Sequence, residues 1–176
     1  MKFKFFRTFP IIVGLSILFG LAFSGLVVAP VFTSSIATAS PGLVAYTPTE
    51  QHGRQIYLRE GCVYCHSQQV RSVKADEPLS TSFGAAKAGD YYYDSPNALG
   101  TSRQGPDLSN EGRVWSKDYG DSAREYLIGH FKNPRAYNPQ SIMPAYDYLS
   151  DSELSDLTDY MQALGAWKDH PPEETP

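Results

Sequence analysis

Residues 62–66 read Cys62-Val63-Tyr64-Cys65-His66, and they contain both cysteines of the 176-residue chain. Two cysteines separated by two residues and followed at once by histidine form the C-x-x-C-H pattern of covalent haem attachment. The spacing suits the chemistry, because each thiol adds to one vinyl group of haem and the adjoining imidazole reaches the iron. The motif therefore predicts one haem c bound through Cys62 and Cys65, with His66 as an axial iron ligand.

Paired cysteines also occur in thioredoxin-like redox sites and in zinc sites. The redox pair is expected within a β-α-β pattern, and a zinc site needs two further ligands at suitable spacing. The chain has no other cysteine, and its remaining histidines, His52, His130 and His170, are scattered. Haem attachment is therefore the preferred interpretation.

A haem that transfers electrons commonly has a second axial ligand, and methionine in that position raises the reduction potential. The chain has three methionines. Met1 precedes a predicted membrane span, and Met161 lies on the apolar stripe of a predicted helix, where core packing is the simpler role. Met143 precedes a proline in a predicted loop, and loops held on a rigid scaffold often supply ligands. We expect His66 and Met143 to fill both axial positions, which leaves no open position for oxygen or peroxide.

Helical patterns lie on both sides of the haem motif. Residues 47–50, Thr-Pro-Thr-Glu, and residues 150–153, Ser-Asp-Ser-Glu, are two capping boxes, and each predicts the start of a helix. A third helix is expected over residues 121–131. Residues 73–101 lack helical periodicity, and no segment has comparable support as a strand. The sequence thus predicts a mainly α domain with three helices around the haem.

The chain begins with Lys2, Lys4 and Arg7, and no charged residue follows until Glu50. Within this region residues 11–29 are almost entirely apolar, and at about 1.5 Å per residue they span roughly 28 Å, close to the thickness of a bilayer core. A cleaved signal peptide is the alternative, since residues 37–39 read Ala-Thr-Ala, but its apolar region is usually only about 7 to 15 residues long. We therefore expect an uncleaved anchor in the bacterial cytoplasmic membrane.

The three N-terminal cations favour a cytoplasmic N-terminus by the positive-inside rule, with the haem domain on the periplasmic side. The resulting division of the chain is a cytoplasmic N-terminus (1–9), a transmembrane helix (10–30), a linker (31–48), a monohaem cytochrome c domain (49–167) and a flexible acidic tail (168–176).

The charge balance limits the possible partners. Lysine and arginine number 15 against 19 aspartate and glutamate, so the net charge is -4. This argues against a nucleic-acid binder that neutralises phosphates. Acidic residues are concentrated after residue 146, where they could steer a basic cytochrome c toward the domain. A solvated helix face with a disordered end explains them equally simply.

Five segments follow one another along the chain and carry a resemblance: REGCVYCHSQQVR (59–71), YYDSP (92–96), GPDL (105–108), NPR (133–135) and MPAY (143–146). In this order they resemble the monohaem subunit II, of CcoO/FixO type, of cbb3-type cytochrome c oxidase, whose haem domain has the class I cytochrome c fold. GPDL and MPAY alone are typical of class I cytochromes c generally. The residues that follow the haem motif are the most specific part.

The resemblance implies a membrane-anchored electron carrier that passes one electron at a time to the haem-copper catalytic subunit and transforms no substrate itself. It implies that His66 and Met143 bind iron, that the Pro106 carbonyl accepts a hydrogen bond from Nδ1 of His66, and that Leu108 packs on the haem ring.

Three arginines, Arg71, Arg103 and Arg113, are candidates for pairing with the haem propionates. Two other functions remain open: the small cytochrome subunit of nitric oxide reductase or of another quinol-oxidising complex, and a free membrane-tethered electron shuttle.

Overall fold

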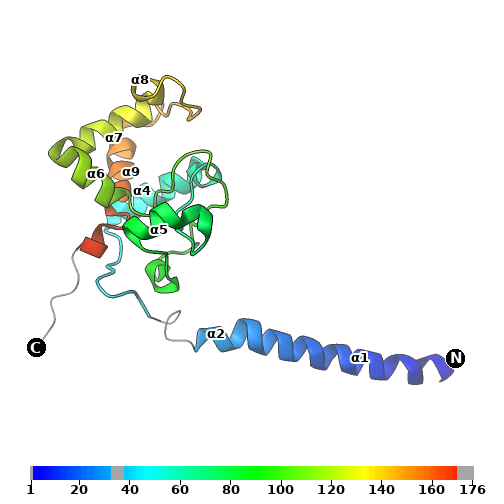
Figure 1. Ribbon diagram of the computed structural model, residues 1–176. Helices are drawn as coiled ribbons and strands as arrows, with labels where there is room; N and C mark the ends of the chain where they lie inside the picture. The colour runs from blue at the N-terminus through cyan, green and yellow to red at the C-terminus, as the bar shows by residue number, and fades with distance from the viewer. Residues whose placement is uncertain (1, 33–37, 170–176) are drawn as a thin grey trace, which may run out of the picture. The chain divides into compact units, whose positions relative to one another are not determined.

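The structure of the chain is a computed structural model, which describes residues 2–32 and 38–169 (Figure 1). These residues form helices, turns and loops, with no strand among them, so the mainly α prediction is confirmed. The chain divides into two bodies: the N-terminal helical segment with residues 38–40 and 88–92, and residues 41–87 with 93–169. Met1, His170 and the rest of the predicted acidic tail lie outside the described residues, as do residues 33–37 of the predicted linker.

The first body contains one continuous helical segment. It comprises α1 (Lys2–Phe23), the π-helical turn η1 (Ser24–Val28) and α2 (Ala29–Val31). Residues Thr8–Val31 form the one candidate membrane span of the described chain, with a mean hydropathy of 2.5. Its large apolar side chains are exposed, and none is buried by the rest of the protein. A helix of this length and apolarity is suited to lipid, because its backbone groups are paired internally. The chain is therefore anchored by a single N-terminal helix.

A short helical turn, η4 (Ala88–Tyr91), also belongs to this body. The Ser40 amide donates to the Gly89 carbonyl at 3.0 Å, and the Ser40 hydroxyl donates to Asp90 at 2.5 Å. A Cβ atom on Gly89 would lie 2.7 Å from the Thr38 carbonyl oxygen. The close approach therefore requires glycine, and it joins residues 88–91 to the segment that follows the anchor.

Two helices form the centre of the second body: α4 (Pro48–Arg59) and α9 (Asp151–Ala163). Both begin with the predicted capping boxes. The Thr47 hydroxyl accepts from the Glu50 amide, and the Glu50 carboxylate accepts from the Thr47 amide. Ser150 and Glu153 make the same reciprocal pair at the start of α9. The two helix starts predicted from the sequence are thus confirmed.

The helices α4 and α9 pack against each other at Gly53. A Cβ atom there would lie 1.9 Å from the backbone oxygen of Asp156 and 2.9 Å from Cβ of Tyr160. No larger residue fits without moving one helix. The side chains of Ile56 and Leu154 are fully buried in the hydrophobic core of this body.

The other helices of the second body are shorter. α6 (Glu111–Tyr119) and α7 (Ala123–Lys132) both contact α9 (Figure 1), and α8 (Pro134–Tyr137) follows α7 directly. α7 confirms the helix predicted over residues 121–131, displaced by one or two residues. α6 was not predicted, since glycine at its second position and few apolar residues obscure its pattern.

The segment 73–101 contains helix although its sequence lacks helical periodicity. It contains the turn η3 (Lys74–Asp76) and the helix α5 (Glu77–Phe83). α5 has Pro78 in its first turn and ends at Gly84, which has a φ of +79°. A helix of seven residues makes less than two turns, too few to show a 3.6-residue period.

Candidate haem site

The two cysteines and His66 follow directly on the end of α4. Gly61 has a φ of +74°, a left-handed conformation that glycine adopts at little cost, and it turns the chain into the 3-10 turn η2 (Cys62–Tyr64). The amides of Cys65 and His66 both donate to the Cys62 carbonyl, at 3.1 Å and 3.0 Å. This compact turn gathers both cysteine side chains and the imidazole, and neither cysteine forms a disulfide.

The imidazole of His66 is held by the GPDL segment. Its Nδ1 donates to the Pro106 carbonyl at 2.8 Å, as the resemblance implied, and the Gly105 amide donates to the Cys65 carbonyl at 2.9 Å. A Cβ atom on Gly105 would lie 2.2 Å from Cε1 of the His66 ring, so only glycine allows the ring this position. No described residue forms a hydrogen bond with Nε2, which is therefore the nitrogen left to bind a metal.

Burial lowers the pKa of His66, while the bond to Pro106 and the nearby Asp107 carboxylate oppose the shift. The ring is therefore neutral at physiological pH, which is the form that binds iron. Burial also raises the pKa of the Cys62 thiol to about 11, against the effect of a hydrogen bond with Tyr146.

Hydrogen bonds at both ends of the MPAY segment hold the loop that carries Met143. The Met143 amide donates to the Ser141 hydroxyl at 3.2 Å, and the Tyr146 amide donates to the Phe131 carbonyl at 2.9 Å. The Tyr146 side chain lies against Cys62, and each of the two groups shifts the pKa of the other through a side-chain hydrogen bond. The loop thus joins the end of α7 to the start of the haem motif.

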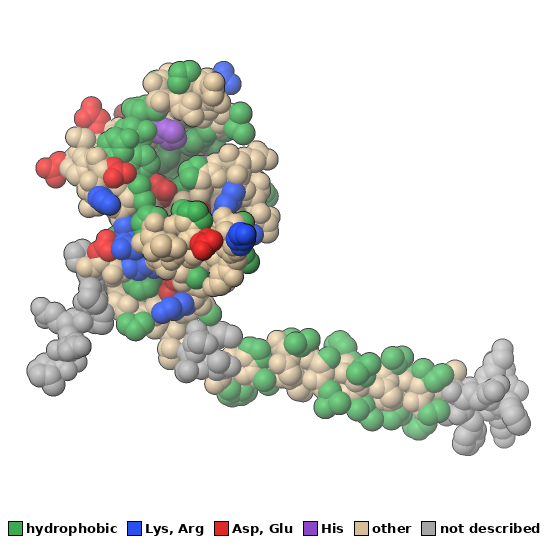
Figure 2. Space-filling view, in the orientation of Figure 1, with side chains coloured by type: hydrophobic (Ala, Val, Ile, Leu, Met, Phe, Trp, Pro, Cys, Tyr) green, Lys and Arg blue, Asp and Glu red, His purple; other side chains and the backbone are tan. Residues whose placement is uncertain are grey.

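The predicted site residues come together in one place. Cys62, Leu108 and Met143 all belong to or pack against the same hydrophobic core cluster, and Pro106 is bonded to His66. Figure 2 shows one face of this body hollowed, with hydrophobic side chains and a histidine in the depression.

The donor set fits a haem and does not fit a structural metal ion. Within residues 2–32 and 38–169 there is no cluster of three or more His, Cys, Asp or Glu that could hold a metal ion. Two thiols beside a neutral imidazole with a free Nε2, on an apolar surface that includes a methionine, match the chemistry of a c-type haem.

Comparison with known proteins decides the family. A family model described as "Cytochrome C oxidase, mono-heme subunit/FixO" matches residues 4–169. The chain belongs to this family. No curated protein matches the chain.

FixO proteins are the monohaem cytochrome c subunits of cbb3-type oxidases, so this chain is a membrane-anchored electron-transfer subunit that carries a haem. The match includes the N-terminal helix as well as the haem motif. It favours an oxidase over the two alternatives left open by the sequence, a nitric oxide reductase subunit and a free shuttle.

In this FixO-family cytochrome the three candidate arginines all have carboxylate partners. Arg71 and Arg103 both donate to Asp76, whose side chain is only 1% exposed, and Arg113 pairs with Asp169 at 2.7 Å. The two arginines hold the pKa of Asp76 well below its usual range. Sequence reasoning missed this acceptor, because nothing in the local pattern marks one aspartate as buried.

Arg103 also joins the haem motif to the GPDL segment. It donates to the Ser67 hydroxyl at 2.5 Å and to the Asp107 carboxylate at 3.3 Å, and Ser67 itself donates to Asp107 at 2.6 Å. The Leu108 amide donates to the Ser67 carbonyl at 2.8 Å. In the FixO-family cytochrome this network fixes Pro106 and Leu108 relative to His66.

A second motif of the resemblance, YYDSP, has a structural role. Arg54 on α4, whose side chain is almost fully buried, forms an ion pair with Asp94 at 3.3 Å and donates to the carbonyls of Ser95 and Pro96. These contacts attach residues 94–96 to α4, the helix that leads into the haem motif.

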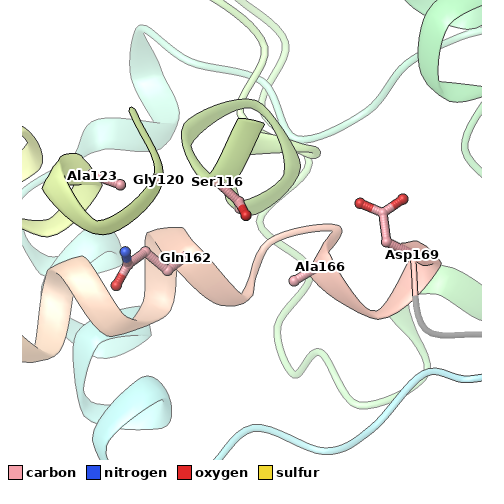
Figure 3. Close-up of a pocket in the computed structure, with 7 residues that line it drawn as sticks. Ser116, Gly120, Ala123, Gln162, Ala166 and Asp169 are labelled. Atoms are coloured by element: carbon pink, nitrogen blue, oxygen red, sulfur yellow. The ribbon is translucent and has the colours of Figure 1, made fainter. Parts of the chain in front are cut away.

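A surface cavity of about 270 Å³ lies between α6 and the end of α9, lined in part by Ser116, Gln162 and Asp169 (Figure 3). None of its lining residues belongs to the haem site of the FixO-family cytochrome.

Proposed function

We propose that the haem is attached covalently through Cys62 and Cys65, with His66 and Met143 as its axial ligands. The observation that carries this proposal is the fixed imidazole of His66, with Nδ1 bonded to Pro106 and Nε2 left for iron, on the same turn as two cysteines that form no disulfide. When bound, the haem supplies a one-electron couple between Fe(III) and Fe(II).

The residues around the site act on the orientation and the environment of that couple. The Pro106 carbonyl fixes the His66 tautomer and makes the ring a better donor. Leu108, at the buried end of the GPDL segment, would pack against the bound haem and exclude water from it. The bond between Tyr146 and Phe131 holds the loop that presents the Met143 sulfur. Methionine ligation and exclusion of water both raise the reduction potential.

We also propose the sidedness and the partners. Three cations precede the exposed apolar helix, which supports residues 1–9 in the cytoplasm, residues 10–30 in the membrane and a linker over residues 31–48. The monohaem domain, residues 49–167, is then periplasmic, followed by the acidic tail, residues 168–176. The electron acceptor is the haem-copper catalytic subunit, and the donors are other cytochromes c.

Isolation of the native complex tests the assignment of the partner. The full-length chain, tagged at its C-terminus and extracted from membranes in mild detergent, should migrate with a large integral membrane subunit that contains copper and haem. A complex that contains non-haem iron and no copper would contradict the oxidase assignment. Migration of the chain alone would support a free shuttle instead.

A further inference from the structure

The carboxylate of Asp107 is buried, and both of its oxygens accept hydrogen bonds from the protein. Its side chain is only 2% exposed. Oδ2 accepts from the Ser67 hydroxyl at 2.6 Å and from the Gln69 amide at 2.9 Å. Oδ1 accepts from the amide of Ser109 at 3.0 Å and from its hydroxyl. Because donors meet both oxygens, the carboxylate is held in one orientation.

The Pro106 carbonyl, which accepts from Nδ1 of His66 at 2.8 Å, belongs to the peptide between Pro106 and Asp107. Pro106 has no amide hydrogen, so its own nitrogen donates nothing that would hold this peptide in place. The Asp107 side chain attaches the peptide to Ser67 and Gln69, just beyond the haem motif. The aim of the carbonyl at the imidazole therefore depends on this side chain as well as on the neighbouring backbone bonds.

The charge of Asp107 belongs to a cluster of two carboxylates and two guanidinium groups. Arg103 donates to Asp107 at 3.3 Å and to both oxygens of Asp76, at 2.5 Å and 2.9 Å. Arg71 donates to the same two oxygens of Asp76, at 3.1 Å and 3.0 Å. Buried charges are costly unless they are paired, and here the formal charges cancel. Asp107 is therefore a paired carboxylate.

A carboxylate at this position acts on His66 through the Pro106 carbonyl. A hydrogen bond from the second ring nitrogen raises the basicity of a metal-bound imidazole. A negative charge next to the accepting carbonyl strengthens that bond, because it attracts the donated proton. A more basic imidazole stabilises Fe(III) relative to Fe(II), so the held carbonyl and the adjacent charge both lower the reduction potential.

We propose that Asp107 is a positioning residue for the axial histidine. Its carboxylate aims the Pro106 carbonyl at Nδ1 of His66 and lowers the reduction potential of the haem. The resemblance gives roles to Pro106 and Leu108 and none to the residue between them. The inference rests on the proposed ligation of iron by His66.

The test uses the full-length protein with its haem, in detergent, and three variants. Asp107→Asn removes the charge and one of the two accepting oxygens, whereas Ser67→Ala removes one donor and leaves the carboxylate. Asp118→Asn is the matched control, because it removes the same charge from an exposed position on α6. Two properties are measured: the midpoint potential, and the rate at which the Nδ1 proton of His66 exchanges with solvent in the ferrous protein, followed by NMR.

Asp107→Asn should raise the midpoint potential and speed exchange of the Nδ1 proton about fivefold, the effect of losing one net hydrogen bond. Ser67→Ala should speed exchange by a smaller factor, and Asp118→Asn should match the wild type in both properties. If Asp107→Asn does not bind haem, exchange in Ser67→Ala decides the test.

A wild-type potential and exchange rate in Asp107→Asn would overturn the inference and leave Asp107 a packing residue, even if the variant unfolds more easily. Wild-type exchange in Ser67→Ala would overturn it where Asp107→Asn binds no haem. Equal rises in potential in Asp107→Asn and Asp118→Asn would overturn it by showing a general effect of charge. A high-spin haem in the wild type would instead contradict the proposed ligands themselves.

Discussion

Glu111, the first residue of α6, is a buried carboxyl group whose titration should control the stability of the haem domain. Glu111 is only 8% exposed to solvent. Burial raises the pKa of Glu111 to about 7 from an ordinary value of 4.5; the nearby Asp107 carboxylate adds to the shift, and the Trp115 side chain opposes it. The folded protein therefore holds this proton more tightly than the unfolded chain does.

The sign of the pH dependence follows from that difference. Below about pH 4.5 Glu111 is protonated in both states, and its contribution to stability is fully present. As pH rises through the folded pKa, near 7, the unfolded chain releases the proton more readily, and the free energy of unfolding falls. A difference of about 2.5 pKa units corresponds to about 3 kcal/mol, at about 1.4 kcal/mol per unit.

Glu111→Gln removes the titration and keeps the shape of the side chain. Guanidinium unfolding of the full-length protein in detergent, followed by haem absorption at pH 5 and pH 8, measures the effect. Between these two pH values the wild type should lose about 2–3 kcal/mol more stability than the variant does, because a smaller part of the effect is already lost below pH 5. Glu125→Gln, at an exposed position on α7, should retain the wild-type dependence. Equal pH dependence in the wild type and Glu111→Gln would refute the reasoning.

Three further substitutions test the site and its support. Gly105→Ala places a methyl group against the His66 ring. It should destabilise the haem domain by about 1–3 kcal/mol and cause partial loss of the low-spin spectrum. A spectrum and an unfolding midpoint like those of the wild type would count against the contact. Asp76→Asn should lower the guanidinium concentration at the unfolding midpoint at neutral pH. The difference in midpoint from the wild type should shrink below about pH 4, where Asp76 becomes protonated in the unfolded chain. A midpoint difference independent of pH would exclude the charge of Asp76 as its cause. Met143→Leu should keep the haem attached, lower the midpoint potential and allow carbon monoxide to bind ferrous haem, whereas unchanged ligation would remove Met143 from the iron.

Features encoded by neighbouring residues could be predicted from the sequence. The capping boxes at Thr47 and Ser150 involve residues three apart, and both form as expected. The turn at Cys62–His66 is equally local. The bond between His66 and Pro106, implied by the resemblance, is present although 40 residues separate the two.

Features that depend on distant residues could not be predicted. Nothing near Gly53 in the sequence shows that another helix passes within contact distance of its Cα. The burial of Asp76 depends on arginines at positions 71 and 103, and an aspartate in the charged segment 74–77 resembles solvated surface. His130 likewise appears in the sequence as one scattered histidine, and only the fold brings its ring against Tyr137.

The central claim is that Cys62 and Cys65 bind one haem covalently. Intact-mass spectrometry of the chain, purified from membranes and then denatured, tests it most directly. The account predicts the mass of the polypeptide plus one haem, with no added haem in a Cys62→Ala, Cys65→Ala double variant. Recovery of the wild-type chain at the mass of the unmodified polypeptide, with its haem removed by denaturation, would contradict the account.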